Sequence, residues 1–223
     1  MFDFSTLKGK LIVSCQALPD EPLHGSFIMG KMARAAEEGG AGAIRSQGMA
    51  DILAIKEACS LPVIGLVKRD YDDSDIYITP TKKEVDELLA TGCDVISLDM
   101  TNRKRPHGER IEDLIAQIHA AGRAVQADVS TFEEGVQAEK LGADAISTAM
   151  SGYTPYSPQM DGPDLEIVRR LVQTVKIPVF GEGRIHEAAD LRAMMATGAY
   201  GAVIGGAITR PQQITKRFVE AMA

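Results

Sequence analysis

The sequence predicts an α/β protein, folded over its 223 residues as one (β/α)8 barrel of the TIM-barrel type. Short apolar runs alternate with amphipathic segments eight times, and neither a linker nor a change of composition interrupts the alternation. Apolar strands between amphipathic helices are typical of a parallel sheet covered by helices. Eight such units in this length favour a closed barrel over an open sheet, so we expect a single domain, 1–223.

Four of the predicted strands begin with a recurring phrase of glycine and small residues. The phrase reads GGAGAI at 39–44, TGCDVI at 91–96, LGADAI at 141–146 and TGAYGAVI at 197–204. Each copy follows a helical pattern, at 31–38, 82–90, 133–140 and 187–196. Glycine ends a helix by accepting a left-handed cap, so each phrase predicts the end of a helix and the start of a strand.

The other four strands lie between these phrases. They are predicted at 10–16, 62–68, 123–129 and 178–183. Two of them open with proline, which suits the first residue of a strand. The sequences TKKE from Thr81 and STFE from Ser130 are both typical of capping boxes, so we expect a helix to start at each.

Composition and charge exclude several classes of protein. A formal net charge of −7 argues against a nucleic-acid-binding surface and against recruitment to anionic membranes. The beginning lacks the pattern of a signal peptide, and no apolar stretch approaches the length of a membrane span. The cysteines, Cys15, Cys59 and Cys93, are scattered and odd in number, as expected for reduced thiols. We therefore expect a cytoplasmic protein.

Catalytic groups of this fold lie at the carboxyl ends of the strands and in the loops that follow. The predicted strand ends carry Gln16, Arg45, Lys68, Asp99, Asp128, Thr148, Glu182 and the pair Gly205–Gly206. Burying so many polar groups would be costly without a purpose, so we expect a shared pocket at this end of the barrel. The structural alternative is that some of these charges only mark where a strand leaves the core, and that Asp99 braces its loop.

Lys68, Asp128 and Glu182 follow strands three, five and seven, whose inward residues share layers and can converge. A lysine near two carboxylates forms a tuned acid/base set. Burial lowers the pKa of the lysine and the carboxylates raise it, and this balance decides whether the amine serves as a base.

Glycine-rich segments follow the last two strands and predict a phosphate site. They read GEGR at 181–184 and GGAITRP at 205–211. Glycine-rich backbone lets amide groups approach a ligand, and a short helix near Ala207 would add the positive end of its dipole. Arg184 or Arg210 could hold the phosphate with two hydrogen bonds. Tight turns alone are the simpler alternative. Nucleotide-binding glycine motifs are absent, and the four histidines lack metal-ligand spacing, so we expect no cofactor and no metal.

Two further segments carry weaker signals. RKRPH at 103–107 could steer a phosphorylated substrate, but an exposed loop is the favoured interpretation. The loop at 151–163, rich in tyrosine and proline, is expected to form a shaped wall over the pocket.

Over nearly its whole length, the chain resembles the N-acetylmannosamine-6-phosphate 2-epimerases, bacterial enzymes of sialic acid catabolism. The resembling stretches are LIVSCQALPDEPLH (11–24), VKRDY (67–71), ADVSTFEEG (127–135), SGYTPY (151–156), GEGRI (181–185) and GGAITRP (205–211). One departure is SQGMA after Arg45, which concerns a loop contact more than the chemistry.

The resemblance implies interconversion of N-acetylmannosamine 6-phosphate and N-acetylglucosamine 6-phosphate without redox cofactor or metal. It implies that Lys68 is the acid/base lysine and that Glu182 works beside it. The residues implied to bind the sugar are Gln16, Arg45 and Asp128, and those implied to bind the phosphate are Gly183, Gly205, Gly206 and Arg210. The apolar spacing in 213–223 permits a helix that packs on its own barrel or on a partner, and a homodimer is favoured.

Two other functions fit the same residues. A lysine at a strand end near carboxylates is also typical of a Schiff-base lyase or aldolase, in which the amine acts as the nucleophile. The alternative without catalysis is a sensor, a barrel that binds a sugar phosphate and signals its presence. The sequence leaves open which direction dominates, whether one base or two act, and which group stabilises the enolate.

Overall fold

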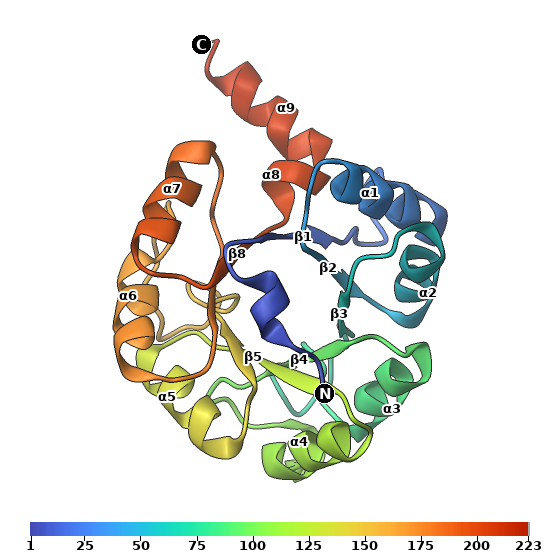
Figure 1. Ribbon diagram of the computed structural model, residues 1–223, viewed down its shortest axis with the longest axis vertical. Helices are drawn as coiled ribbons and strands as arrows, with labels where there is room; N and C mark the ends of the chain where they lie inside the picture. Colours follow the sequence, from blue (N-terminus) through green and yellow to red (C-terminus); the bar gives the residue numbers. More distant parts are fainter. Residues whose placement is uncertain (223) are drawn as a thin grey trace.

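The computed structural model describes residues 1–222 and contains a closed barrel of parallel strands in the order of the chain, with β8 paired to β1 (Figure 1). The strands are β1 (Leu11–Cys15), β2 (Ala43–Gln47), β3 (Val63–Leu66), β4 (Val95–Asp99), β5 (Ala124–Asp128), β6 (Ala145–Ser147), β7 (Val179–Glu182) and β8 (Gly201–Ile204). The predicted (β/α)8 barrel is confirmed, and each strand lies within the segment expected for it or directly continues it.

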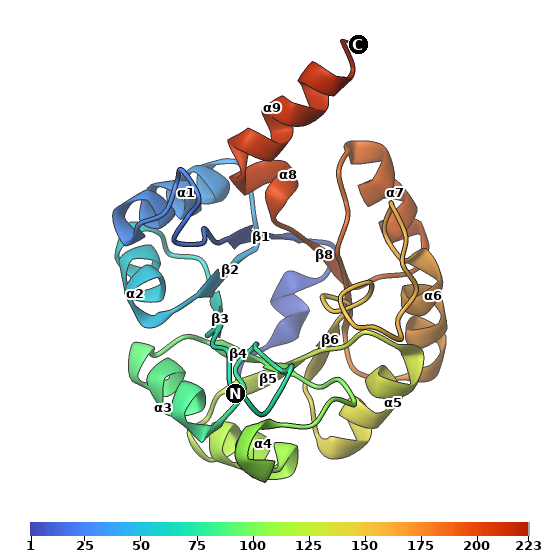
Figure 2. The same cartoon turned by 180° about the vertical axis from the view of Figure 1, so that it is seen from behind.

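Helices α1 to α7 surround the barrel (Figures 1 and 2). The helices are α1 (Ser26–Glu38), α2 (Met49–Ala58), α3 (Lys82–Thr91), α4 (Ile111–Ala120), α5 (Phe132–Leu141), α6 (Leu165–Thr174), α7 (Ala188–Ala196), α8 (Gly206–Thr209) and α9 (Pro211–Glu220), with 3-10 turns η1 (Phe4–Leu7) and η2 (Pro106–Gly108). Within residues 1–222, no helix has the length and apolar character needed to cross a membrane.

Capping boxes start α3 and α5. Thr81 and Glu84 form the expected box at α3. At α5 the expected box at 130–133 is wrong by one residue, because Thr131 is the cap and Glu134 closes the box. The Glu134 carboxylate accepts from the amides of both Ser130 (2.7 Å) and Thr131 (3.0 Å), so it satisfies two donors that Glu133 does not.

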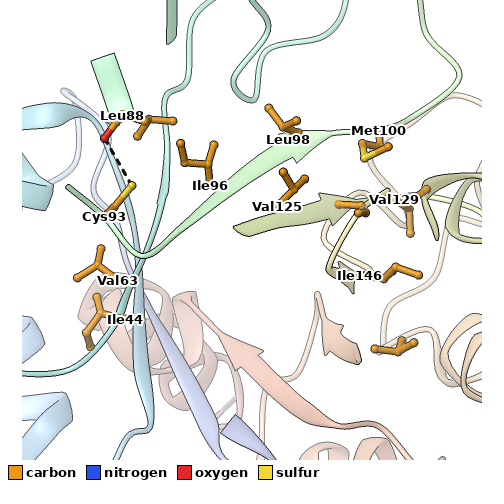
Figure 3. Close-up of a cluster of buried hydrophobic side chains, with 14 of the residues drawn as sticks. Ile44, Val63, Leu88, Cys93, Ile96, Leu98, Met100, Val125, Val129 and Ile146 are labelled. Carbon is orange, nitrogen blue, oxygen red and sulfur yellow. Dashed lines mark hydrogen bonds between the residues drawn. The ribbon is translucent and has the colours of Figure 1, made fainter. Parts of the chain in front are cut away.

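The apolar core has an outer and an inner layer. The outer layer packs the strands against the helices, and Figure 3 shows part of it, including the thiol of Cys93 donating to the Leu88 carbonyl at 3.6 Å. On β5, Val125 and Ala127 belong to this layer, whereas Ala124 belongs to the inner one. Alternate residues of a strand face opposite sides, so Gln126 and Asp128 point into the barrel as Ala124 does.

The inner layer closes the amino-terminal end of the barrel. Phe4 and Leu7 of η1 pack there against Ile12 and Phe180, and the Phe4 and Phe180 rings lie 6.2 Å apart. Figure 1 shows η1 in front of the barrel, and Figure 2 shows the opposite end, where the loops after β3 and β6 lie toward the viewer. The carboxyl end is therefore the end that remains available for a site.

The segment 103–107 is only in part the exposed loop expected for it, because Lys104 and His107 are exposed but Arg105 and Pro106 are buried. The Arg105 side chain is buried and donates to the carbonyls of Thr79, Pro80 and Asp99. Arg103 pairs with Asp99 at 2.6 Å and donates to the Asp75 carbonyl at 2.7 Å. These arginines fasten the loop after β4 to the loop after β3, which is a structural role that the sequence pattern did not reveal.

Candidate active site

A cavity of about 300 Å³ opens at the carboxyl ends of the strands. Its walls come from β1, β2, β7 and β8 and from the loops after β3, β6, β7 and β8. Nine of the ten residues predicted for the site line this cavity: Gln16, Arg45, Lys68, Glu182, Gly183, Arg184, Gly205, Gly206 and Arg210. The tenth, Asp128, is fully buried and lies outside the lining.

Arg45 connects the two predicted carboxylates. It lies on β2 and its guanidinium donates to Asp128 Oδ2 from Nη2 and to Glu182 Oε1 from Nη1, at 2.5 Å in each case. Only 4% of Arg45 is exposed, so these charge-assisted bonds are shielded from water. Asp128 thus belongs to the site through Arg45, one layer behind the cavity wall.

The remaining carboxylate oxygens are also occupied. Ser97 donates to Asp128 Oδ1 at 3.1 Å, and Ser147 donates to Glu182 Oε2 at 2.6 Å. The pKa of Asp128 is raised to about 7, mainly by burial and also by the Glu182 charge, with the Arg45 charge opposing this rise. Both carboxylates are therefore fixed by donors other than Lys68.

Lys68 follows β3, and an antiparallel bridge joins its backbone to Ile78. Among residues 1–222 no side chain forms an ion pair or hydrogen bond with its amine. The pKa of Lys68 is lowered to about 8, mainly by burial and also by the charges of Arg45 and Arg210, which together outweigh the opposing charges of Glu182 and Asp128. Near neutral pH a useful fraction of this amine is uncharged, as a general base or an amine nucleophile requires.

The glycine-rich segments meet on the side of the cavity opposite Lys68, since β3 and β7 are four strands apart in a closed barrel of eight. Gly183 and Arg184 have φ of 105° and 53°, a left-handed backbone that suits glycine. A Cβ at Gly183 would meet nothing closer than 4.0 Å, so the open cavity faces this backbone. Helix α8 begins at Gly206, as expected for the short helix near Ala207.

The two predicted phosphate arginines have different partners. Arg184 donates to the carbonyls of Ser151 (2.6 Å) and Gly162 (2.8 Å), and it thereby holds the loop 151–163 against the cavity. Arg210 pairs with Glu21 through Nε (2.5 Å) and Nη2 (3.0 Å), so one of its terminal nitrogens stays outside this pair. This geometry favours Arg210 over Arg184 as a ligand for a phosphate group.

Asp99 braces the loop after β4, as the structural alternative for this residue predicted. It accepts from the Thr101 amide at 3.0 Å and pairs with Arg103, and it does not line the cavity. Thr148 likewise exchanges hydrogen bonds with the Glu182 backbone, at 3.0 Å each way. Both residues therefore support the wall of the site.

Sequence reasoning missed several lining residues. They include Ser14, Tyr77, Met150, His186 and Gln213, whereas Tyr153 belongs to the loop 151–163, which was expected to form a wall of the pocket. Ser14 could have been found, because it lies two residues before Gln16 on the same face of the strand, and it accepts a hydrogen bond from Gln16 Nε2 at 2.8 Å. Tyr77 and Met150 lie in loops, and no periodicity marks their direction.

No three His, Cys, Asp or Glu side chains gather as a metal-binding group within residues 1–222. The groups that can do chemistry are an amine of lowered pKa, an arginine held between two carboxylates, and glycine-rich backbone across the cavity. In a (β/α)8 barrel this arrangement fits an enzyme that acts on a small phosphorylated molecule by proton transfer or amine chemistry.

Comparison with known proteins narrows this class. The family described as "Putative N-acetylmannosamine-6-phosphate epimerase" matches residues 29–223. A protein of Clostridium perfringens with the description "Putative N-acetylmannosamine-6-phosphate 2-epimerase" is 63% identical over 97% of this chain and 98% of its own length, and one of Clostridioides difficile is 55% identical over 97% of each. The chain belongs to the N-acetylmannosamine-6-phosphate 2-epimerase family.

One solved structure supports this assignment, and a more distant one shares the fold. The N-acetylmannosamine-6-phosphate 2-epimerase of Clostridium perfringens superposes with a TM-score of 0.96 at 62% identity, over 98% of this chain and 95% of that chain. The thiamine phosphate pyrophosphorylase of Pyrococcus furiosus has a TM-score of 0.63 at 24% identity, over 95% and 93% of the two chains, and it shows the fold alone.

Proposed function

We propose that this protein is an isomerase that interconverts N-acetylmannosamine 6-phosphate and N-acetylglucosamine 6-phosphate at C2, in the catabolism of sialic acid and amino sugars. The family supports this activity. The observation that carries the mechanism is the Lys68 amine, whose pKa is lowered to about 8 and which lies across the cavity from the glycine-rich loops. The whole chain, 1–223, acts as one barrel domain.

The chemistry requires an open sugar chain. In the closed ring the C2 hydrogen is not acidic, whereas in the open chain it lies next to the C1 aldehyde. The uncharged Lys68 amine takes the C2 proton and becomes an ammonium, and the electron pair of the broken C–H bond moves to the C1 oxygen as an enolate. A proton then reaches the opposite face of C2, either from the Lys68 ammonium itself or through Glu182 while Lys68 releases its extra proton to solvent, and the aldehyde reforms.

The other site residues support this transfer. Arg45, fixed by Asp128 and Glu182, presents a rigid positive charge beside Lys68, where it stabilises the developing enolate. Glu182 is the carboxylate that works beside the lysine, and 13% of its side chain is exposed toward the cavity. Gln16 offers a buried Oε1 atom that lacks a partner within residues 1–222, so it can accept a hydrogen bond from a sugar hydroxyl.

The phosphate binds on the other side of the cavity. Backbone amides of Gly183, Gly205 and Gly206, the start of α8 and the side chain of Arg210 form the anion site, with Arg184 holding the loop above it. Binding energy gained there, far from C2, holds the open chain in register with Lys68.

The protein works in the cytoplasm as a homodimer, without nucleic-acid or membrane partners. Helix α9 supports the dimer: it extends away from the barrel in Figures 1 and 2, none of its residues is buried, and Phe218 (72%) and Val219 (60%) are exposed. A helix with such an apolar face needs a second surface to cover it. Light scattering after gel filtration tests this proposal: we expect a dimer mass for the native protein and a monomer mass for Phe218→Ser.

Conversion of N-acetylmannosamine 6-phosphate, followed by proton NMR, tests the activity. We expect N-acetylglucosamine 6-phosphate to appear with the native protein and with Lys83→Met, which alters an exposed lysine of α3. Lys68→Met should lower the rate by at least about a thousandfold, the scale of one essential acid/base group. Activity retained by Lys68→Met would contradict the assignment of the base.

Reduction with borohydride distinguishes the lyase alternative. A base that only removes a proton forms no imine, so borohydride added with substrate should leave the mass of the protein unchanged. A stable adduct on Lys68 would instead favour a Schiff-base lyase or aldolase. Tight binding of the sugar phosphate without turnover by the native protein would favour the sensor alternative.

A further inference from the structure

A small apolar cluster lies at the mouth of the barrel, apart from the two main layers. Leu66, Ile78 and Met150 form it, each less than 5% exposed, and Tyr77 packs against it. Tyr77, Ile78 and Met150 all line the cavity. The mechanism given above uses none of these residues, although they cover part of the wall of the same pocket.

This cluster lies beside the proposed base. The backbone of Ile78 is bridged to that of Lys68, and the Thr79 amide donates to the Val67 carbonyl at 2.7 Å. The loop that carries the cluster is fixed further, because Arg105 donates to the Thr79 and Pro80 carbonyls. The cluster is therefore a fixed wall next to the amine, formed by the loop after β3 and completed by Met150 from the loop after β6.

The hydroxyl of Tyr77 has no strong partner. Within residues 1–222 its one hydrogen bond goes to the sulfur of Met150, at 3.7 Å, and a thioether is a weak acceptor. A half-buried phenol in a cavity wall can donate its hydrogen bond to a stronger acceptor when a ligand brings one into the cavity. Tyr77 and Met150 thus present one hydrogen-bond donor next to an apolar surface.

We infer that Tyr77, Ile78 and Met150 form the subsite for the N-acyl group of the substrate and set the length of the acyl chain that the enzyme accepts. This inference rests on the proposed function. With the phosphate of C6 on the β7–β8 side and C2 at Lys68, the substituent of C2 lies at the far end of the sugar, beside the cluster. An acyl group has a carbonyl that accepts from Tyr77 and a methyl group that packs on Ile78 and Met150.

Acyl-chain selectivity tests this inference. The experiment compares kcat/KM for the N-acetyl, N-propanoyl and N-butanoyl forms of mannosamine 6-phosphate with native protein and Met150→Ala. We expect the native protein to prefer the N-acetyl form, and Met150→Ala to raise the ratio of N-butanoyl to N-acetyl kcat/KM by about tenfold, the scale of one or two methylene groups in an apolar pocket. Ile78→Val, a milder truncation, should shift the ratio in the same direction.

The matched control is Met160→Ala, an exposed methionine of the same loop that does not line the cavity. It should leave the ratio unchanged. A variant that is merely destabilised loses activity toward all three substrates by one factor, so an unchanged ratio in both Met150→Ala and Ile78→Val would overturn the inference.

The hydroxyl of Tyr77 is tested separately. Tyr77→Phe should raise KM for the N-acetyl substrate by about tenfold, as expected for one lost hydrogen bond to a ligand. Tyr200→Phe, which removes a hydroxyl beside Phe180 at the other end of the barrel, should leave KM unchanged. An unchanged KM in Tyr77→Phe would remove Tyr77 from the subsite. Absence of any epimerisation by the native protein would instead overturn the proposed function itself.

Discussion

The carboxylate of Glu182 is paired with Arg45, at 2.5 Å, and not with Lys68. Asp128 is paired with the same guanidinium. Because Arg45 takes both carboxylates, Lys68 is left beside a cation and in a buried setting, and both effects lower its pKa. The arrangement that orients Glu182 is thus also the one that keeps the lysine available as an uncharged amine.

The first prediction concerns the pH dependence of the native enzyme. The pKa of Lys68 is lowered to about 8, and only the uncharged amine accepts the C2 proton. We expect kcat/KM to rise with pH, tenfold per unit well below pH 8, and to level off above it. Initial rates between pH 6.5 and 9.5 measure this profile. A rate that is flat from pH 6.5 to 8 would show that the base has another pKa.

The second prediction concerns Asp128→Asn. The negative charge of Asp128 raises the pKa of Lys68, so removing this charge lowers that pKa. We expect the rising limb of the kcat/KM profile to move to lower pH, while the maximal rate falls because Arg45 loses a charged partner. Asp113→Asn, which changes an exposed residue of α4, serves as the control. A limb that moves to higher pH would contradict this electrostatic account.

The third prediction concerns stability. Since the pKa of Lys68 is about 8 in the folded protein and about 10.5 when unfolded, the folded state binds the proton more weakly, and the charged lysine destabilises it. Lys68→Met should raise the free energy of unfolding at pH 7 by about 3 kcal/mol. The penalty is complete below pH 8 and disappears as the pH rises toward 10.5.

Urea unfolding of native protein and Lys68→Met at pH 7 and pH 10 checks this. The free energy of unfolding of Lys68→Met should exceed that of the native protein most at pH 7, and this difference should shrink at pH 10. An advantage of equal size at both values would mean that methionine acts through packing alone. Lys83→Met, in an exposed position, should change neither value by more than about 0.5 kcal/mol.

Most of the fold could be predicted from the sequence because glycine phrases and apolar runs are local signals of helix ends and strands. The start of α5 was wrong by one residue because two adjacent positions offer a capping side chain, and only the geometry of Glu134 decides between them. The role of Arg105 was missed because its acceptors are backbone carbonyls of distant segments, and these have no signature in the sequence.

The site divides in the same way. Nine of ten predicted residues line the cavity because strand ends and the loops after them are fixed by the barrel itself. The pairing of Arg45 with both carboxylates could not be predicted, because it depends on a side chain that reaches across the barrel. Tyr77 and Met150 were missed because loops determine their positions.

The fourth prediction concerns Arg105. Its buried guanidinium satisfies three backbone carbonyls, and Arg105→Met would leave them without this donor. We expect the free energy of unfolding to fall by about 3 kcal/mol, since a buried acceptor left unpaired costs its desolvation. Arg110→Met removes an exposed arginine that pairs with Glu112 at 3.7 Å, and it should cost less than about 1 kcal/mol. Equal losses in the two variants would contradict the structural role of Arg105.

The most direct test of the central claim, removal of the C2 proton by Lys68, is proton NMR of N-acetylmannosamine 6-phosphate with the protein in deuterated water. The amine of Lys68 exchanges its hydrogens with solvent, so we predict N-acetylglucosamine 6-phosphate that carries deuterium at C2. Product that keeps its original hydrogen at C2 after many turnovers would contradict deprotonation by a solvent-exchanging lysine.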